Sequence, residues 1–293
     1  HTDEAWHDRK GKSFHPGTSY YVGGNTKVYG GALFRLREKD FKQVEHIGGI
    51  SPEWCLKYDD FEPYYNEAER LYQVHGRQGL DPTEPKRYRD YTFPPISHEP
   101  RIQEIHDELQ AKGLNPFNLP LAIRLNEVDR LMSSCIRCNT CDGFPCLVDA
   151  KSDADITCIR PSLDRENITL ITEAKVVKLQ TNEAGTEVTG VETDVRGETK
   201  IFSADIVVVA CGAINSAILL LRSANDRHPQ GLANSSDLVG RNFMKHLNGA
   251  IVGISTKPNP SKFQKTIGIN DFYWGEEGFN HPMGHVQMLG KVN

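Results

Sequence analysis

The sequence lacks any long hydrophobic run. Among its 293 residues the longest apolar stretches are Ile206–Ala210 and Ala217–Leu221, far shorter than the roughly 20 residues that cross a bilayer. A basic tract is also missing, because 39 acidic residues outnumber 34 basic ones and the net charge is -5. Such a chain has no electrostatic reason to bind nucleic acid or an anionic membrane. We therefore expect a soluble globular protein that acts on a small molecule.

The seven cysteines do not form the pattern of a disulfide framework. Their number is odd, and Cys135, Cys138, Cys141 and Cys146 all fall within twelve residues. A chain of this length can bury a core without disulfide bonds. We therefore expect a cytoplasmic protein, and the sequence says nothing about its oligomeric state.

The sequence also has no Gly-x-Gly-x-x-Gly turn, with which a dinucleotide-binding fold places a pyrophosphate at a helix N-terminus. It begins His1-Thr2-Asp3-Glu4, without a methionine and without the basic and apolar regions of a signal peptide. We expect the chain to be an internal piece of a longer protein.

Glycine is concentrated near the start, where Gly23, Gly24, Gly30 and Gly31 fall within nine positions. A backbone of this kind turns tightly or comes close to a flat partner. Two helices are predicted downstream, one from Asp59 or Asp60 as N-cap and one over residues 101–112. The predicted buried face of the first consists of Phe61, Tyr64, Tyr65, Ala68, Leu71 and Tyr72.

The second half predicts mainly strands. Residues 174–181, 187–195 and 199–202, joined by short turns, predict a β-meander. Residues 205–210 then read as a buried parallel strand that leads through Cys211-Gly212-Ala213 into a helix over 214–223. Adenine nucleotides bind beyond the carboxyl ends of such strands. The alternative interpretation is an ordinary strand-to-helix turn that binds no ligand. From Gly249 onward, short apolar stretches between turns predict part of a second, antiparallel sheet.

Four segments carry a family resemblance, and they occur in the family's order. They are Val22–Gly31, Asn167–Leu170 with Ala174–Val176, Val207–Ser216 and Leu238–His246. In turn they resemble the flavin-cradling loop, the adenine-pairing stretch, the second flavin segment and the start of the substrate domain of glucose–methanol–choline (GMC) oxidoreductases. Two positions depart from the family pattern: Tyr29 stands where Asn is frequent, and Asn215-Ser216 replaces a Thr-Pro type pair.

The resemblance implies FAD as cofactor and a mixed α/β fold. That fold would be a partial glutathione-reductase-type FAD domain with the β-meander, followed by part of an antiparallel-sheet substrate domain. Residues 1–45 would hold the flavin loop, 46–130 a helical lid and substrate segment, 131–228 a second FAD-domain segment, and 229–293 the start of the substrate sheet. The implied cofactor-binding residues are Gly23, Gly24, Asn25, Thr26, Val28, Gly30, Val176, Ala210, Cys211 and Gly212.

No catalytic residue is assigned within the chain. In the family, the pyrophosphate turn precedes the glycine loop and the catalytic histidine lies near the C-terminus, so we expect both outside residues 1–293. We expect His246 to be structural. Family members that tether the flavin use a histidine where this sequence has Val28, and this implies that FAD is bound without a covalent link.

The resemblance further implies oxidation of a CH–OH group, and the loop spacing is similar to sugar-oxidising relatives of the pyranose oxidase type. Tyr20, Tyr21 and Tyr29, with Asn25 and Lys27, offer flat faces and hydrogen-bond partners that a sugar needs. The alternatives are choline or another alcohol as substrate, and tyrosines that only pack beneath the flavin.

The cysteine cluster has the pattern C-x-x-C-x-x-C, followed by a fourth cysteine five residues after the third. Thiolates at this spacing could hold zinc or iron. Some GMC relatives carry an iron–sulfur cluster at a comparable place. However, Gly143-Phe144-Pro145 is apolar, and the following Ala150–Asp153 matches family members without a metal. We predict no metal here and interpret the cysteines as mostly buried thiols with at most one labile disulfide. A non-catalytic module with a structural four-cysteine metal site is the alternative.

Overall fold

The computed structural model describes residues 6–244 and 246–290, and these divide into two compact units. Unit 1 contains the chain up to Ile168 and from Ser255 onward, and unit 2 contains Thr169–Ile254. Both units combine helices with small sheets, so the predicted mixed fold class is confirmed at that level. The four-part division of the sequence concerns roles within a longer protein and stays a prediction.

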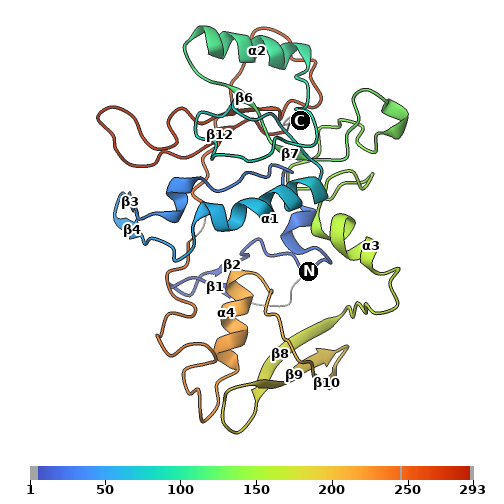
Figure 1. The fold of residues 1–293 in the computed structure, drawn as a ribbon, viewed down its shortest axis with the longest axis vertical. Coiled ribbons are helices and arrows are strands. Elements are labelled where there is room, and N and C mark those ends of the chain that lie inside the picture. The colour runs from blue at the N-terminus through green and yellow to red at the C-terminus, as the bar shows by residue number, and fades with distance from the viewer. Residues whose placement is uncertain (1–5, 245, 291–293) are drawn as a thin grey trace. The chain divides into compact units, whose positions relative to one another are not determined.

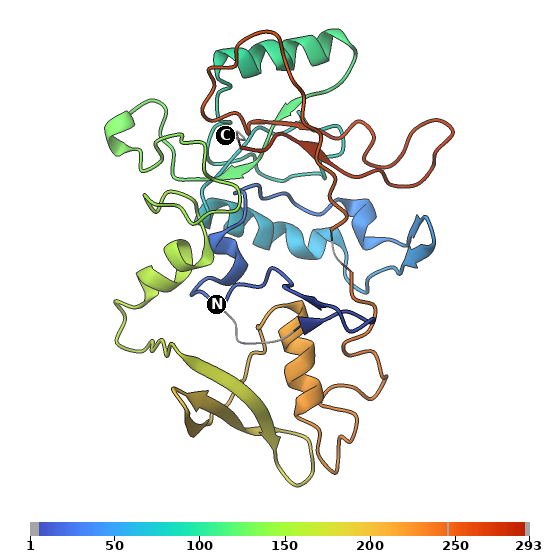
Figure 2. The same cartoon turned by 180° about the vertical axis from the view of Figure 1, so that it is seen from behind.

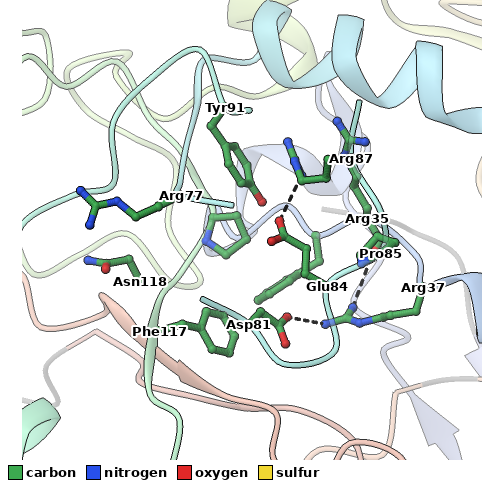
Figure 3. Close-up of a pocket in the computed structure, with 12 residues that line it drawn as sticks. Arg35, Arg37, Arg77, Asp81, Glu84, Pro85, Arg87, Tyr91, Phe117 and Asn118 are labelled. Carbon is green, nitrogen blue, oxygen red and sulfur yellow. Dashed lines mark hydrogen bonds and ion pairs between the residues drawn. The ribbon is translucent and has the colours of Figure 1, made fainter. Parts of the chain in front are cut away.

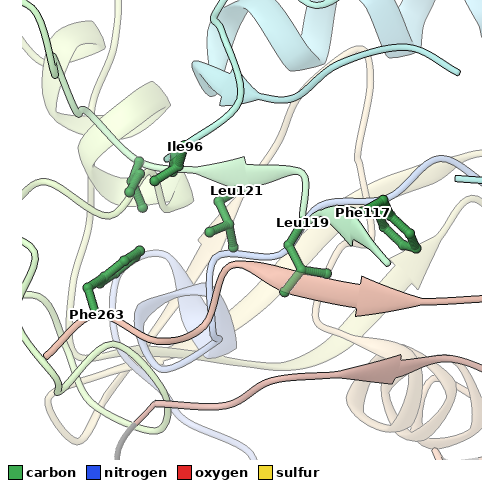
Figure 4. Packing of buried hydrophobic residues seen from close by; sticks show 6 residues of the cluster. Ile96, Phe117, Leu119, Leu121 and Phe263 are labelled. Carbon is green, nitrogen blue, oxygen red and sulfur yellow. The ribbon is translucent and has the colours of Figure 1, made fainter. Parts of the chain in front are cut away.

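The core of unit 1 is built on short antiparallel strands (Figure 1). β11 (Ile267–Ile269) pairs with both β12 (Val286–Gln287) and β6 (Phe117–Asn118). β5 (Val74–His75) pairs with β7 (Leu121–Ala122). The antiparallel sheet predicted for the C-terminal segment is therefore confirmed, but its third strand comes from about 150 residues earlier. The buried cluster around these strands is Ile96, Phe117, Leu119, Leu121, Ile123 and Phe263 (Figure 4).

The remaining short elements of unit 1 surround this core. β1 (Trp6–His7) pairs with β2 (Ser13–Phe14), and β3 (Val44–His46) pairs with β4 (Gly49–Ser51). The short helical turns are η1 (Gly24–Lys27), η2 (Glu38–Phe41), η3 (Arg130–Met132) and η4 (Asp155–Ile159). The short helix α3 (Arg160–Ser162) follows η4 directly. η1 lies within the glycine-rich loop, and η4 lies in the segment that packs against this loop.

Helix α1 (Tyr58–Leu71) forms where a helix was predicted, but its buried face differs from the predicted one. Its buried residues are Tyr58, Glu62 and Glu69, whereas Tyr64 is 70% exposed. The two glutamates are buried because buried arginines from elsewhere in unit 1 pair with them, a tertiary contact that apolar periodicity cannot reveal. The N-cap is Lys57, whose N–H donates to the Asp60 carboxylate at 2.8 Å, rather than Asp59 or Asp60 itself.

The second predicted helix is confirmed. α2 spans Pro100–Ala111, with Pro100 in its first turn and Ile102 buried. Gly113 follows in a left-handed conformation (φ 83°), as a residue just past a helix end commonly does.

Unit 2 contains the predicted meander and the helix after it (Figure 2). β8 (Ala174–Thr181), β9 (Val188–Val195) and β10 (Glu198–Phe202) pair antiparallel in sequence order. α4 (Ala213–Arg222) packs on β8 through a buried cluster of Leu179, Leu219 and Leu232. These strands and α4 are confirmed within a residue of their predicted bounds.

The parallel strand predicted over residues 205–210 is wrong. Val207 and Val209 pack on the unit 2 cluster, but Ile206 is 81% exposed and Val208 is 79% exposed. Within the part of the chain that the structure describes, no strand pairs with this segment. The alternating burial is that of a strand, but a strand also requires a neighbour for its N–H and C=O groups.

Two segments discussed in the sequence analysis include residues that lie outside the described ranges. Lys245, within the segment resembling the start of the substrate domain, lies outside them, as do residues 1–5. Val239 and Gly240 form a turn, and none of Leu238–Met244 lies in a helix or strand. Among the helices that the structure describes, none is long and apolar enough to cross a membrane. A cytoplasmic location stays a prediction.

Candidate flavin site

The glycine-rich loop folds into a tight turn. Gly23 has φ 89° and Gly24 has φ 55°, and the N–H groups of Thr26 and Val28 donate to the carbonyls of Gly23 and Asn25 at 3.3 and 3.1 Å. A Cβ at Gly23 would lie 3.0 Å from the Asp155 nitrogen, so the protein's own packing requires that glycine. A Cβ at Gly24 would meet nothing within 4 Å. The open backbone of the loop is therefore at Gly24, where a flat ligand can approach.

The polar side chains beside these glycines bind the protein itself. The Thr26 hydroxyl donates its single proton to the Gly23 carbonyl and accepts from the Ala154 N–H at 3.1 Å. The Asn25 side-chain oxygen accepts from the Ser19 N–H at 2.7 Å. In this conformation the turn itself uses the Thr26 hydroxyl proton.

Lys27 also faces inward. Its ammonium pairs with Asp155 and lies 3.3 Å from Asp153. Burial acts to raise the pKa of Asp155, but hydrogen bonds and charge from Lys27 and Arg160 outweigh it and leave the pKa below its ordinary value. The loop is thereby anchored to η4. Lys27 therefore anchors the loop, and its role toward a sugar stays a prediction.

Two buried lysines, which the sequence did not single out, hold the far end of the loop. Lys151 is 1% exposed, and its ammonium donates to the carbonyls of Tyr29, Cys141 and Phe144 at 2.6, 2.9 and 2.8 Å. Lys265, 3% exposed, donates to the Gly30 carbonyl and, at 2.5 Å, to the Asp142 carboxylate. Nothing in a single sequence marks their contacts with the loop, because Tyr29 and Gly30 lie 122 and 235 residues away from Lys151 and Lys265.

Gly30 and Val28 are explained by the same packing. A Cβ on Gly30 would overlap the Asp142 carboxylate, and the Val28 carbonyl accepts from the Gly143 N–H at 3.0 Å. Tyr29 points into the protein, where its hydroxyl donates to the Ser152 carbonyl, and burial raises its pKa above the ordinary value. Of the three tyrosines considered as sugar-binding surfaces, only Tyr20 and Tyr21 are exposed.

The other predicted cofactor residues lie in unit 2. Val176 lies in β8 opposite Thr193, immediately before a register shift of the meander. Ala210, Cys211 and Gly212 are exposed at the N-terminus of α4. Gly212 has φ 81°, and a Cβ there would meet nothing within 4 Å. Like Gly24 in unit 1, it offers open backbone to a ligand.

The chain can now be compared with known proteins. The sequence model of the family described as GMC oxidoreductase matches residues 11–248. The chain belongs to this family. FAD is the cofactor of GMC enzymes, and the open backbone at Gly24 leaves room for a flat cofactor of that kind.

Curated relatives are oxidases and dehydrogenases. The chain is 33% identical over 256 residues to the 6'''-hydroxyparomomycin C oxidase of Streptomyces lividus (86% of this chain, 44% of that protein). It is 32% identical over 262 residues to the paromamine 6'-oxidase of Streptomyces fradiae (88% and 45%). It is 31% identical over 231 residues to the fructose dehydrogenase large subunit of Gluconobacter japonicus (77% and 41%). The chain thus spans less than half the length of these relatives.

A solved FAD-dependent oxidoreductase from Chaetomium thermophilum aligns with 73% of the chain and 36% of its own, at a TM-score of 0.46 and 14% identity.

The four clustered cysteines lie in unit 1 as half-buried free thiols, and the Cys141 carbonyl shares the Lys151 ammonium with Tyr29 of the loop. Burial raises the pKa of Cys141 to about 12 and also raises that of Cys135. Across residues 6–244 and 246–290, no three His, Cys, Asp or Glu side chains are gathered as a metal site would require. The expectation of a metal-free cluster stays a prediction.

A small pocket in unit 1 is lined by charged side chains that already pair with one another (Figure 3). Arg37 lies 3.1 Å from Asp81. Arg35 makes a two-pronged contact with Glu69 of α1, with each bond 2.8 Å long. Arg87 pairs with Glu69 and Glu84. This network, which the sequence did not predict, fixes α1 to the chain around it and leaves the glycine loop as the candidate cofactor site.

Proposed function

We propose that this chain forms part of an FAD-dependent oxidoreductase that oxidises a CH–OH group of a sugar or sugar-like polyol. The observation that carries the proposal is the family match over residues 11–248, which includes the glycine-rich loop. The names of two relatives support the substrate class, because one is a fructose dehydrogenase subunit and the other a paromamine 6'-oxidase. The finer fold, a glutathione-reductase-type FAD domain, belongs to the same proposal.

We propose distinct roles for the predicted cofactor residues. Gly24 and Gly212 would receive the cofactor on their open backbone, and Val176 would meet adenine through its main chain. Asn25, Thr26, Val28 and Gly30 would shape the loop from within, since their polar groups or Cα positions contact the protein. Ala210 and Cys211 would set the approach to Gly212.

FAD, when bound, would supply the acceptor for the hydride that leaves the carbon carrying the hydroxyl. The residues of this chain contribute binding and orientation: the two lysines and the Lys27 ion pairs hold the loop in one conformation, so that its open backbone is preformed. No described residue is proposed as the base that takes the hydroxyl proton.

The test is purification of the full-length protein, followed by a visible spectrum and turnover with an artificial electron acceptor. We expect a flavin spectrum and higher specificity constants for sugars or polyols than for choline or aliphatic alcohols. A protein without flavin would refute the oxidoreductase, and bound metal in its place would favour the structural-module alternative. A better specificity constant for choline or a long alcohol would refute only the substrate class.

A flavin bound without a covalent link is also expected, because Val28 has no nucleophilic atom. Acid precipitation should leave all flavin in the supernatant, and flavin in the washed protein pellet would contradict this expectation.

A further inference from the structure

The sequence contains one Asn-Gly pair, Asn248-Gly249, and one Asp-Gly pair, Asp142-Gly143. Both pairs carry the same latent reaction, in which the amide nitrogen of the glycine attacks the side-chain carbonyl carbon of the residue before it. Glycine favours this attack because it has no Cβ to hinder the approach and leaves the backbone the most freedom. The outcome then depends on how firmly the structure holds the nitrogen and the side chain.

The Asp142-Gly143 pair is held at both reacting groups. The Gly143 N–H donates to the Val28 carbonyl at 3.0 Å. The Asp142 carboxylate accepts from the Lys265 ammonium at 2.5 Å and from the Gly290 N–H at 2.7 Å. The nitrogen and the carboxylate are both engaged elsewhere, so reaction at this pair would require the contacts beside the glycine-rich loop to open.

The Asn248-Gly249 pair is open at both groups. It lies in an exposed stretch outside any helix or strand, with Leu247 93% exposed and Ile251 100% exposed beside it. No described residue hydrogen-bonds to the Gly249 N–H or to the Asn248 side chain. A Cβ built on Gly249 would meet nothing within 4 Å, so the surroundings leave the backbone room to bring the nitrogen and the side chain together.

Another asparagine of unit 2 shows the opposite case. Asn234 precedes a small residue, Ser235, but it is only 3% exposed. Its side chain donates to the Gln230 carbonyl at 2.8 Å and accepts from the Val239 N–H at 2.9 Å. This side chain cannot turn toward the next backbone nitrogen without losing both bonds, so Asn234 provides an internal reference for Asn248.

We propose that Asn248 is a modification site, at which the folded protein converts its own side-chain amide into a carboxylate through attack by the Gly249 nitrogen. The site is independent of the proposed oxidoreductase activity. The conversion adds one negative charge to a chain of net charge -5, because a carboxyl group with an ordinary pKa of about 3.9 is ionised at neutral pH. The charge appears directly after Leu238–His246, the segment that resembles the start of the substrate domain.

The reaction balances without an oxidant or a cofactor. The Gly249 nitrogen gives up its proton to solvent and forms a bond to the Asn248 side-chain carbonyl carbon. The bond from that carbon to the amide nitrogen breaks, and ammonia leaves after taking up a proton. Water then opens the resulting five-membered succinimide ring at either carbonyl, which gives aspartate or isoaspartate. One water is consumed and one ammonia is released.

The first experiment follows the tryptic peptide His246–Lys262 from full-length protein kept folded at mildly alkaline pH. We expect a growing fraction in which the Asn248 amide has become an acid, divided between aspartate and isoaspartate and carrying one heavy oxygen when the water is isotopically labelled. The peptides that contain Asn234 and Asp142-Gly143 should stay unchanged. A His246–Lys262 peptide that keeps its amide, or that converts only after unfolding in urea, would overturn the proposal.

The second experiment compares Gly249→Ala with Gly253→Ala, an exposed glycine in the same stretch whose added Cβ also meets nothing within 4 Å. Gly249→Ala should slow the conversion roughly threefold or more, because a Cβ restricts the attacking backbone, and Gly253→Ala should leave the rate unchanged. Isoelectric focusing gives a second measure, since the converted form focuses at lower pH, and Asn248→Gln should lose that form. Equal rates in the wild type and Gly249→Ala would show that the Gly249 nitrogen is not the attacking group and would overturn the mechanism.

Discussion

Lys151→Met provides the sharpest test of how the flavin loop is held. The substitution keeps the apolar stem of the side chain but removes the ammonium that donates to the carbonyls of Tyr29, Cys141 and Phe144. Three acceptors that share one buried cation lose it together. A buried polar group left unpaired costs about 1–3 kcal/mol, and some of this cost is recovered where the carbonyls find water.

We therefore expect Lys151→Met to lower the free energy of unfolding by about 3–5 kcal/mol, the range for breaking a buried charged contact. The assay is urea unfolding of the full-length protein, with the slope of the transition checked so that only the midpoint changes. FAD affinity should fall with stability, because the loop carries the open backbone at Gly24.

The matched control is Lys262→Met, at an exposed lysine three residues before Lys265. It should change the free energy of unfolding by no more than about 0.5 kcal/mol. Equal midpoints for the two variants would refute the view that the Lys151 ammonium supports the loop. A destabilised Lys151→Met protein with unchanged FAD affinity would separate the stability of unit 1 from cofactor binding and refute the second half of the reasoning.

Three further outcomes are expected. Gly24→Ala should weaken FAD binding, whereas the control Gly48→Ala should not, and flavin titration of both variants measures the difference. Both glycines are left-handed with open space around them, so each substitution should cost about 1 kcal/mol of stability. Glu69→Gln should cost about 3–5 kcal/mol in urea unfolding, because two buried arginines lose their shared carboxylate, whereas Glu67→Gln on the exposed side of α1 should be neutral. Burial lowers the pKa of His98 to about 4, so the unfolded state binds a proton more readily between about pH 4 and 6.5 and stability falls as the pH drops through that window. His98→Gln should reduce the loss of unfolding free energy between pH 6.5 and pH 4 by about 1–2 kcal/mol, after allowance for solvent screening. An unchanged dependence of stability on pH would contradict the lowered pKa of His98.

Local sequence signals were sufficient for the meander, α2 and α4. The turns between the meander strands carry Gly185 and Gly197, both with positive φ, and the strands alternate in polarity. The meander strands pair with neighbours close in sequence and α4 packs on β8, whereas α2 is specified by its own helical periodicity and N-terminal proline.

The same reasoning failed where a distant partner decides the outcome. Glu62 and Glu69 look like solvent-facing helix residues, but they are buried because Arg35 and Arg87 pair with them. Residues 205–210 have the composition of a buried strand and lack a paired neighbour among the described residues. In both cases the missing information is tertiary, and composition along the segment does not contain it.

Glycine in a cofactor loop is commonly attributed to the approach of the cofactor, but in this chain each glycine has to be judged separately. Gly23 and Gly30 leave no room for a Cβ because Asp155 and Asp142 fill the space, so their constraint comes from the protein. Gly24 and Gly212 face open space with positive φ, so only backbone geometry constrains them within each unit. A ligand that passes over the backbone would find room at these two positions and not at the other two. We therefore propose that a few of the ten predicted cofactor residues touch FAD and that the others shape the backbone around them, so that variants at the first group should change flavin affinity without changing the fold.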